Sequence, residues 1–147
     1  MSEAPGGGPD SSAPPVVVIV DVANVMGSRP DGWWRDRAAA ATRLLGRMPG
    51  LVGRTAGAPD GASGPTVTIG RVVAVLEGIA KAAAGPAGIE VVRAAADGDG
   101  AIVDEATRLV EAGERVLVVT ADRGLRARLA DDVAVVGPHW FNDLVGR

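Results

Sequence analysis

The run of apolar residues from Val16 to Val20 is the strongest pattern in the chain. Five consecutive branched aliphatic residues predict a short β-strand buried on both faces, as in a parallel sheet. The run stops at Asp21, and Asn24 follows three residues later. A carboxylate at the carboxyl end of a central parallel strand lies where open α/β sheets bind their ligands. We therefore expect the functional site at the end of this strand.

Shorter apolar runs predict four more strands, separated by segments with helical character. The strands are expected at residues 72–76, 89–92, 115–120 and 133–136, and the helices from about residue 31 and over 79–84, 100–113, 123–129 and 139–145. Strands that alternate with helices indicate right-handed crossovers and a parallel sheet. The sequence therefore predicts a single three-layer α/β/α domain with a mostly parallel five-stranded sheet, Rossmann-like, in the flavodoxin-like or a related order.

Two tracts rich in Gly and Pro interrupt this pattern. Residues 1–14 predict a disordered leader, so the folded domain is expected over residues 15–147. Residues 48–65 predict a long, flexible surface loop, and a segment of this length is either a functional lid or disordered.

The composition limits the class of protein. A chain of 147 residues suits one domain with a substantial core. The absence of cysteine excludes disulfides, thiolate metal sites and thiol nucleophiles, and it is typical of the cytoplasm, the location we expect. The first residues lack the features of a signal peptide, and no apolar run reaches about 18 residues, so no membrane association is expected.

The formal net charge of −3 disfavours a broad, sequence-independent grip on nucleic acid, which depends on many cations. All basic residues other than Lys81 and His139 are arginines, however, and arginine is well suited to bidentate contact with phosphate. Carboxylates gathered in one cleft and neutralised by a divalent metal would reconcile the acidic charge with a phosphodiester substrate.

Acidic residues stand at or just beyond the carboxyl ends of four predicted strands. They are Asp21, Glu77, the pair Asp97 and Asp99, and Asp122. In a parallel sheet these ends share one edge, so the residues converge. Two carboxylates about 4 Å apart repel by about 4 kcal/mol at an effective dielectric constant of 20, and a divalent cation offsets that cost. Oxygen ligands favour Mg²⁺ or Mn²⁺, which polarise phosphoryl oxygens and activate bound water.

Three segments carry a family resemblance: D-V-A-N-V-M-G-S-R-P-D-G-W-W-R-D-R, D-G-D-G-A-I-V and V-V-T-A-D-R-G-L-R. Together they resemble the PIN-like nuclease superfamily, most closely its NYN branch, over about residues 16–144. The resemblance implies a metal-dependent (endo)ribonuclease with an Mg²⁺ or Mn²⁺ cofactor and an RNA substrate. By position, it implies that Asp21, Asp99 and Asp122 are catalytic metal ligands, and that Asn24 orients substrate or a metal-bound water.

Two positions match this family pattern less closely. Glu77 stands where related nucleases can have a further acid, and Asp104 follows Asp99 by five residues on the predicted helix, so both are candidate metal ligands. Gly100 stands where similar proteins have a second acid, which leaves Asp97 or Asp104 as a substitute. This departure keeps a second function open, that of a catalytically inactive PIN-like RNA-binding or regulatory module.

The segment after the first strand concentrates arginine and tryptophan: Arg29, Trp33, Trp34, Arg35 and Arg37. One interpretation is a nucleic-acid track, with arginine on phosphate and indole against a base, and Arg29 is expected to bind substrate. The other is a solvated helix face with one tryptophan in the core. Trp34, Ala38, Ala41 and Leu45 recur at helical spacing and are expected to face the sheet.

Structural roles compete with the functional ones at the other candidate residues. Asp122 suits the N-cap of the helix that follows, a role compatible with metal binding. Asp97 and Asp99 lie in a glycine-flanked turn, where aspartate is common for backbone reasons. Arg123, next to Asp122, is expected to bind substrate.

Other enzyme classes and partners are less well supported by the sequence. Ala23 occupies the position where a phosphoaspartyl phosphatase has its second aspartate, and no G-x-G-x-x-G follows the first strand, which argues against a dinucleotide site. A homodimer is compatible with the sequence, whereas no residue pattern indicates an antitoxin-like partner.

Overall fold

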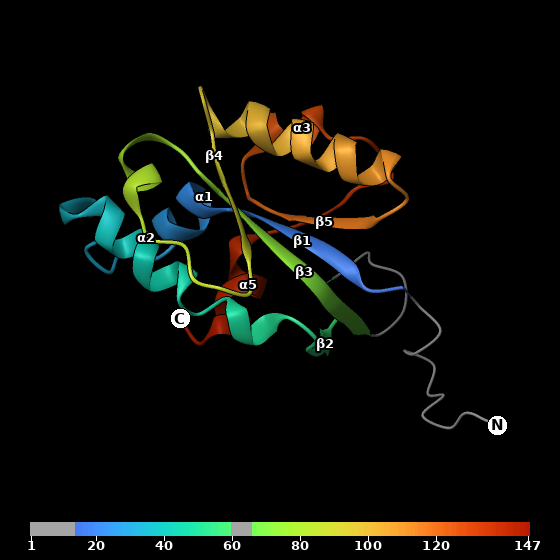
Figure 1. The fold of residues 1–147 in the computed structure, drawn as a ribbon, viewed down its shortest axis with the longest axis horizontal. Helices are drawn as coiled ribbons and strands as arrows, with labels where there is room; N and C mark the ends of the chain where they lie inside the picture. The colour runs from blue at the N-terminus through green and yellow to red at the C-terminus, as the bar shows by residue number, and fades with distance from the viewer. Residues whose placement is uncertain (1–13, 60–65) are drawn as a thin grey trace.

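The structure is a computed structural model that describes residues 14–59 and 66–147. Nearly all of the predicted leader and the end of the predicted loop, residues 60–65, lie outside the described residues. Figure 1 shows the central sheet with helices on both of its faces, which confirms the predicted three-layer α/β/α architecture. Within the described residues, no helix combines the length and the apolar character needed to cross a bilayer.

The sheet is built around two central strands, β1 and β3. Its strands are β1 (Val16–Asp21), β2 (Thr55–Gly57), β3 (Thr66–Leu76), β4 (Glu90–Arg93), β5 (Arg115–Val119) and β6 (Ala134–Val136). Parallel pairs join five of them in the order β4-β3-β1-β5-β6, and β2 pairs with β3 in the antiparallel sense. All five predicted strands are present, in the doubly wound order 3-2-1-4-5 rather than the flavodoxin-like 2-1-3-4-5.

The chain order reverses between β1 and β5, and this switch point positions the site. Val20 of β1 is in register with Val119 of β5, so the next residues, Asp21 and Thr120, emerge together at the carboxyl edge. In open parallel sheets, ligands bind in the crevice at such a reversal.

Two layers of helices cover the sheet. One contains α1 (Val22–Gly27), α2 (Arg37–Leu45), η4 (Gly78–Ala82) and α5 (Pro138–Val145), and the other contains α3 (Gly98–Glu111) and α4 (Arg123–Arg128). Val18 and Val20 of β1 belong to the core of the first layer, and Val17 and Ile19 to that of the second. Because both faces of β1 are buried, its sequence is uniformly apolar rather than alternating.

The segment between β1 and α2 differs from the sequence prediction. Helix α1 was not predicted, and a 3-10 helix, η2 (Trp33–Arg35), precedes α2, which begins at Arg37 rather than near residue 31. This break removes Trp34 from the apolar stripe of the helix. Trp34 is 52% exposed, so the prediction that it faces the sheet was wrong, whereas Ala41 and Leu45 are buried as predicted.

The segment predicted as a flexible loop over residues 48–65 contains two regular elements in its described part. These are the 3-10 helix η3 (Pro49–Leu51) and strand β2, which pairs with the beginning of β3. As a result β3 begins at Thr66, six residues before the predicted strand. Met48 and Leu51 are fully buried in the core, and their apolar burial holds the segment against the sheet.

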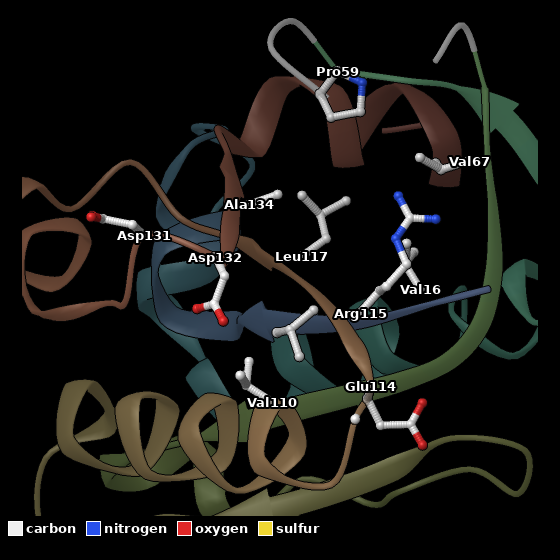
Figure 2. Close-up of a pocket in the computed structure, with 12 residues that line it drawn as sticks. Val16, Pro59, Val67, Val110, Glu114, Arg115, Leu117, Asp131, Asp132 and Ala134 are labelled. Carbon is white, nitrogen blue, oxygen red and sulfur yellow. The ribbon is translucent and has the colours of Figure 1, made fainter. Parts of the chain in front are cut away.

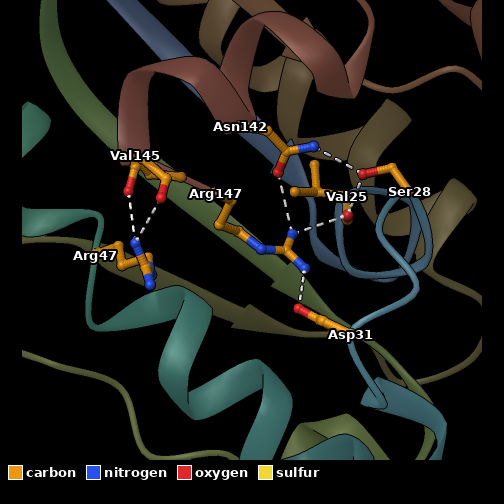
Figure 3. A network of polar contacts seen from close by, with 8 residues as sticks. Val25, Ser28, Asp31, Arg47, Asn142, Val145 and Arg147 are labelled. Carbon is orange, nitrogen blue, oxygen red and sulfur yellow. Dashed lines mark hydrogen bonds and ion pairs between the residues drawn. The ribbon is translucent and has the colours of Figure 1, made fainter.

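Two arginines from outside α5 bind its C-terminal end. Arg47 donates to the carbonyls of Val145 and Gly146 at 2.9 and 3.2 Å (Figure 3), and Arg54 donates to the carbonyl of Leu144 at 2.9 Å. The last carbonyls of a helix have no intrahelical donor and carry partial negative charge. The arginines satisfy them and fix α5 to the segment after α2.

Arg147 then joins α5 to the loop that follows α1. Figure 3 shows its guanidinium donating to the carbonyl of Val25 and the side-chain oxygen of Asn142, both at 3.1 Å, and to the carboxylate of Asp31 at 2.9 Å. Asn142 is buried and donates to Ser28 Oγ at 2.9 Å. Only 8% of the Arg147 side chain is exposed. The network therefore fixes the segment that carries Arg29 and Trp34.

Replacing Arg147 tests this network. We expect Arg147→Ala to lower the free energy of unfolding by about 2 kcal/mol, because three acceptors lose a charged donor. Arg147→Lys should recover only part of the loss, since one ammonium cannot reproduce the planar fork. Urea denaturation measures both. Arg126→Ala, at an exposed residue of α4, is the control, with less than about 0.5 kcal/mol expected. An Arg147→Ala value equal to the control would contradict the assignment.

Candidate functional site

The carboxylate of Asp21 lies at the centre of the candidate site. Asp21 is only 5% exposed; it ends β1 and caps α1, and its Oδ1 accepts from the backbone N–H of Asn24 at 3.3 Å. Its Oδ2 accepts from Thr120 Oγ1 at 2.8 Å. Both carboxylate oxygens are therefore held in one orientation at the switch point of the sheet, where the sequence predicted Asp21 to lie.

The fully buried Thr120 connects Asp21 to Asp122 and was missed as a site residue. While its Oγ1 donates to Asp21, the same oxygen accepts from the backbone N–H of Asp122 at 3.1 Å. Asp122 caps α4, as predicted, by accepting from the backbone N–H of Leu125 at 2.9 Å. The sequence did contain a signal, because Thr120 is the polar residue that ends the apolar run of β5.

Asn24 bridges the two strand ends through its side chain. Its Oδ1 accepts from the backbone N–H of Ala121 at 2.8 Å, which ties α1 to the segment after β5. This oxygen is engaged within the protein, so in this arrangement the Nδ2 group is the part of Asn24 that remains for a substrate. Within the described residues no acceptor for Nδ2 is found.

The beginning of α3 brings a further aspartate to the same edge. Asp97 caps this helix by accepting from the backbone N–H of Gly100 at 2.6 Å, and a Cβ at residue 100 would lie 3.3 Å from that oxygen. Gly100 therefore suits the tight cap. Burial raises the pKa of Asp99, and the charges of Asp122 and then Asp97 raise it further. Asp99 and Asp122 thus interact although they belong to different helices.

Glu77 and Asp104 differ in their relation to this cluster. The Glu77 carboxylate lies against the start of α3, since a Cβ added to Gly98 would be 2.5 Å from Oε1, and its charge raises the pKa of Asp21. Asp104 is exposed in the second turn of α3 and contributes to neither the pKa of Asp21 nor that of Asp99. The structure therefore groups Glu77, but not Asp104, with Asp21.

Burial raises the pKa of Asp21 from 3.8 to about 6. Desolvation is the largest cause, the hydrogen bonds from Thr120 and Asn24 act against it, and the charges of Asp99 and Glu77 add to it. Ionisation of this carboxyl therefore costs the folded protein more than it costs the unfolded chain, although the carboxylate is still the major form at neutral pH. Binding of a proton or a cation stabilises such a carboxylate. Groups with a raised pKa of this kind are common at functional sites.

The side-chain groups around Asp21 that could bind a metal offer oxygen atoms, which are the ligands that a hard divalent cation prefers. Among the described residues, however, no three acidic or histidine side chains are arranged so that they could hold one ion together. Mg²⁺ is usually bound through one or two carboxylates and keeps several waters. The oxygen groups present therefore suit such an ion in chemistry, while the described residues show no group of three carboxylates gathered around one position.

Arginines lie on the segments that follow β1 and β5. Arg29 is half-buried and lines a cavity with Asn24 and His139, whereas Arg123 is exposed at the first residue of α4. Arg128 was not predicted as a site residue, yet its charge lowers the pKa of Asp99. His139 itself is exposed, and its Nε2 lies 3.6 Å from an Asp143 carboxylate oxygen.

Another cavity lies at the opposite edge of the sheet and contains none of the predicted site residues. Figure 2 shows this cavity, of about 510 Å³, at the amino ends of β5 and β6, lined by Arg115, Leu117, Asp132 and Ala134 among others. It has no contact with the strand ends that carry Asp21 and Thr120. Size alone therefore does not identify the candidate site.

Comparison with known proteins supports the fold. No protein-family model matches the chain, and no curated protein sequence matches it either. A structural match is the crystal structure of a mutant of Rae1 (YacP) from Bacillus subtilis, with a TM-score of 0.68 and 17% sequence identity, covering 89% of this chain and 75% of that chain. At this identity the likeness shows a shared fold and no more.

The raised pKa of Asp21 predicts that its ionisation destabilises the metal-free fold. Because the folded pKa (about 6) exceeds the unfolded value (3.8), Asp21 contributes most to stability below pH 3.8, and this contribution is lost as the pH rises through 6. This loss is about 3 kcal/mol. Asp21→Asn avoids it, because an amide does not ionise, but weakens the hydrogen bond from Thr120 at a cost of about 1 kcal/mol. In EDTA, urea unfolding should find Asp21→Asn about 2 kcal/mol more stable than wild type at pH 8.

This advantage should disappear by pH 4, where the wild-type carboxyl is largely neutral in the folded protein. A variant that is less stable than wild type at pH 8 would instead assign Asp21 a purely structural role.

The two bonds of Thr120 predict a cost for removing its hydroxyl. Thr120→Val keeps the volume but leaves the Asp21 carboxylate and the Asp122 N–H each short of one partner, so the free energy of unfolding should fall by about 2 kcal/mol at pH 8. The loss should be smaller at pH 4, where a neutral Asp21 needs the donor less. Urea unfolding of Thr120→Val and of the exposed control Thr107→Val checks this, with less than about 0.5 kcal/mol expected for the control.

Proposed function

We propose that this protein is a metal-dependent ribonuclease of the PIN-like kind, acting at the carboxyl edge of the sheet. The observation that carries the proposal is the buried carboxylate of Asp21, whose pKa is raised to about 6 beside Asp99 and Glu77. The sequence resemblance to PIN-like nucleases and the fold shared with Rae1 support it. A carboxylate that is costly to ionise without a cation suits a site that operates with one.

In the proposed site, Asp21 would hold an Mg²⁺ or Mn²⁺ ion together with Asp99 or Asp122. Such an ion, when bound, would supply Lewis-acid chemistry for hydrolysis of an RNA phosphodiester. Thr120 keeps Asp21 in orientation by donating to its Oδ2. The Nδ2 group of Asn24 donates to a phosphate oxygen.

Two arginines complete the proposed site. Arg29 lines the cavity that also contains Asn24 and His139, and Arg123 begins α4. In the proposed site, both neutralise phosphates beside the reacting one. They follow β1 and β5, the two strands between which the chain order of the sheet reverses.

A catalytically inactive RNA-binding or regulatory module is the second candidate. Two observations favour it: no three acidic side chains of the described residues could hold one ion together, and Gly100 takes the place of an expected acid. In that case the carboxylates have a structural role, since Asp21, Asp97 and Asp122 all cap helices. Activity and metal binding distinguish the two candidates.

Cleavage of labelled single-stranded RNA in Mg²⁺ or Mn²⁺ tests the proposal. We expect wild-type cleavage to stop in EDTA, and Asp21→Asn to lower the rate at least about 100-fold, equivalent to about 2.7 kcal/mol of transition-state stabilisation. Asp132→Asn makes the same change at an exposed residue of the opposite edge and should leave the rate unaltered.

Calorimetric titration with Mn²⁺ gives a readout independent of activity. Binding is expected to wild type and Asp132→Asn and not to Asp21→Asn. RNA binding without cleavage and without Mn²⁺ binding would reject the nuclease and leave the inactive module.

A further inference from the structure

Two cavities lie along the layer of α1 and α2 and share Arg29 as a lining residue. The first, about 490 Å³, is lined by Asn24, Ala121, Ser28 and Arg29 among others. The second is about 240 Å³. Asn24 connects the first cavity to the candidate site, because its backbone N–H donates to Asp21 and its side chain accepts from Ala121.

The second cavity concentrates positive charge. Arg29, Arg43, Arg47 and Arg147 line it, and Asp31 is its one acidic lining residue. Four positive side chains against one negative side chain give a local formal charge of +3, although the chain as a whole carries −3. Arginines are thus concentrated in one hollow of a chain with an acidic excess. This hollow is called the arginine cavity below.

The arginines of this cavity fall into two pairs. Arg47 and Arg147 are engaged by backbone carbonyls at the ends of α5 and α1, and Arg147 also binds Asp31, whose pKa its hydrogen bond lowers. Arg29 and Arg43, in contrast, make no hydrogen bond or ion pair with any described residue. The first pair builds the wall, and the second pair leaves its donors for an anionic ligand.

An exposed indole follows Arg29 by five residues. Trp34 is 52% exposed, its ring meets that of Trp33 edge to face with centroids 5.9 Å apart, and the Arg35 guanidinium lies 5.9 Å from its centroid. Trp33 is half-buried against the core, and a Cβ on Gly27, which lines the first cavity, would lie 3.8 Å from its ring. Trp33 thus anchors the pair of indoles near the first cavity, which shares Arg29 with the arginine cavity.

We propose that the arginine cavity and Trp34 form a binding site for single-stranded RNA outside the reacting centre. Arg29 and Arg43 bind a backbone phosphate, and Trp34 stacks on a base of the same strand. Stacking on an indole requires an unstacked base, which a single strand offers and a duplex does not. The choice of RNA as the ligand rests on the proposed function. The new element is the position at which the strand binds after it leaves the reacting centre.

Fluorescence anisotropy with a labelled 12-nucleotide RNA in EDTA tests binding without cleavage, using the full chain carrying Asp21→Asn in every variant. Trp34→Ala should weaken binding about tenfold with an unchanged salt dependence, and Trp34→Phe should restore most of it. Arg43→Ala should weaken binding and reduce the slope of log K against log salt by about 0.7, the value for one phosphate of a single strand. Arg108→Ala removes the same charge from the opposite layer and should leave the slope unaltered.

The outcomes separate this inference from the proposed function. The inferred RNA site is overturned if the Trp34→Ala and Arg43→Ala proteins are folded by circular dichroism and bind RNA as tightly as the background protein. This holds even if the wild type cleaves RNA. Equal losses for single-stranded and duplex RNA also overturn it. If the wild type never cleaves, but both substitutions have the expected effects, the nuclease proposal fails and the RNA site stands.

Discussion

The site depends on one buried interaction, the pair of hydrogen bonds that Thr120 makes with Asp21 and with the backbone of Asp122. Through that hydroxyl, the end of β1 and the start of α4 share a partner. Asn24 adds a second bridge, from α1 to Ala121. These contacts cross the point where the chain order of the sheet reverses, so the topology brings the groups together and the side chains fix their orientation.

The same arrangement carries an electrostatic cost. Asp21 is desolvated, and Asp99 and Glu77 add repulsion, so the fold keeps at its edge a carboxylate whose ionised form it does not favour. Structural capping alone does not require this burial, because Asp97 caps α3 while exposed. The cost at Asp21 is the feature that most strongly separates a functional interpretation from a purely structural one.

Local patterns were sufficient for much of the fold and for part of the site. The apolar run of β1, the position of Asp21 and the cap formed by Asp122 depend on neighbouring residues, so the sequence predicted them. Helix α1 and the exposure of Trp34 did not follow from periodicity, because the break at η2 shifts the helical phase. The Thr120–Asp21 pair is separated by 99 residues and the Arg147–Val25 pair by 122, and no local pattern encodes such pairs.

The length of β3 has a consequence for how the protein behaves at high concentration. One side of this strand pairs with β1, and its other side is divided between β2, which covers the beginning, and β4, which covers the end. The sheet borders formed by β2, β4 and β6 are only three or four residues long. Short borders give another chain little backbone to pair with, which guards the described domain against edge-to-edge aggregation.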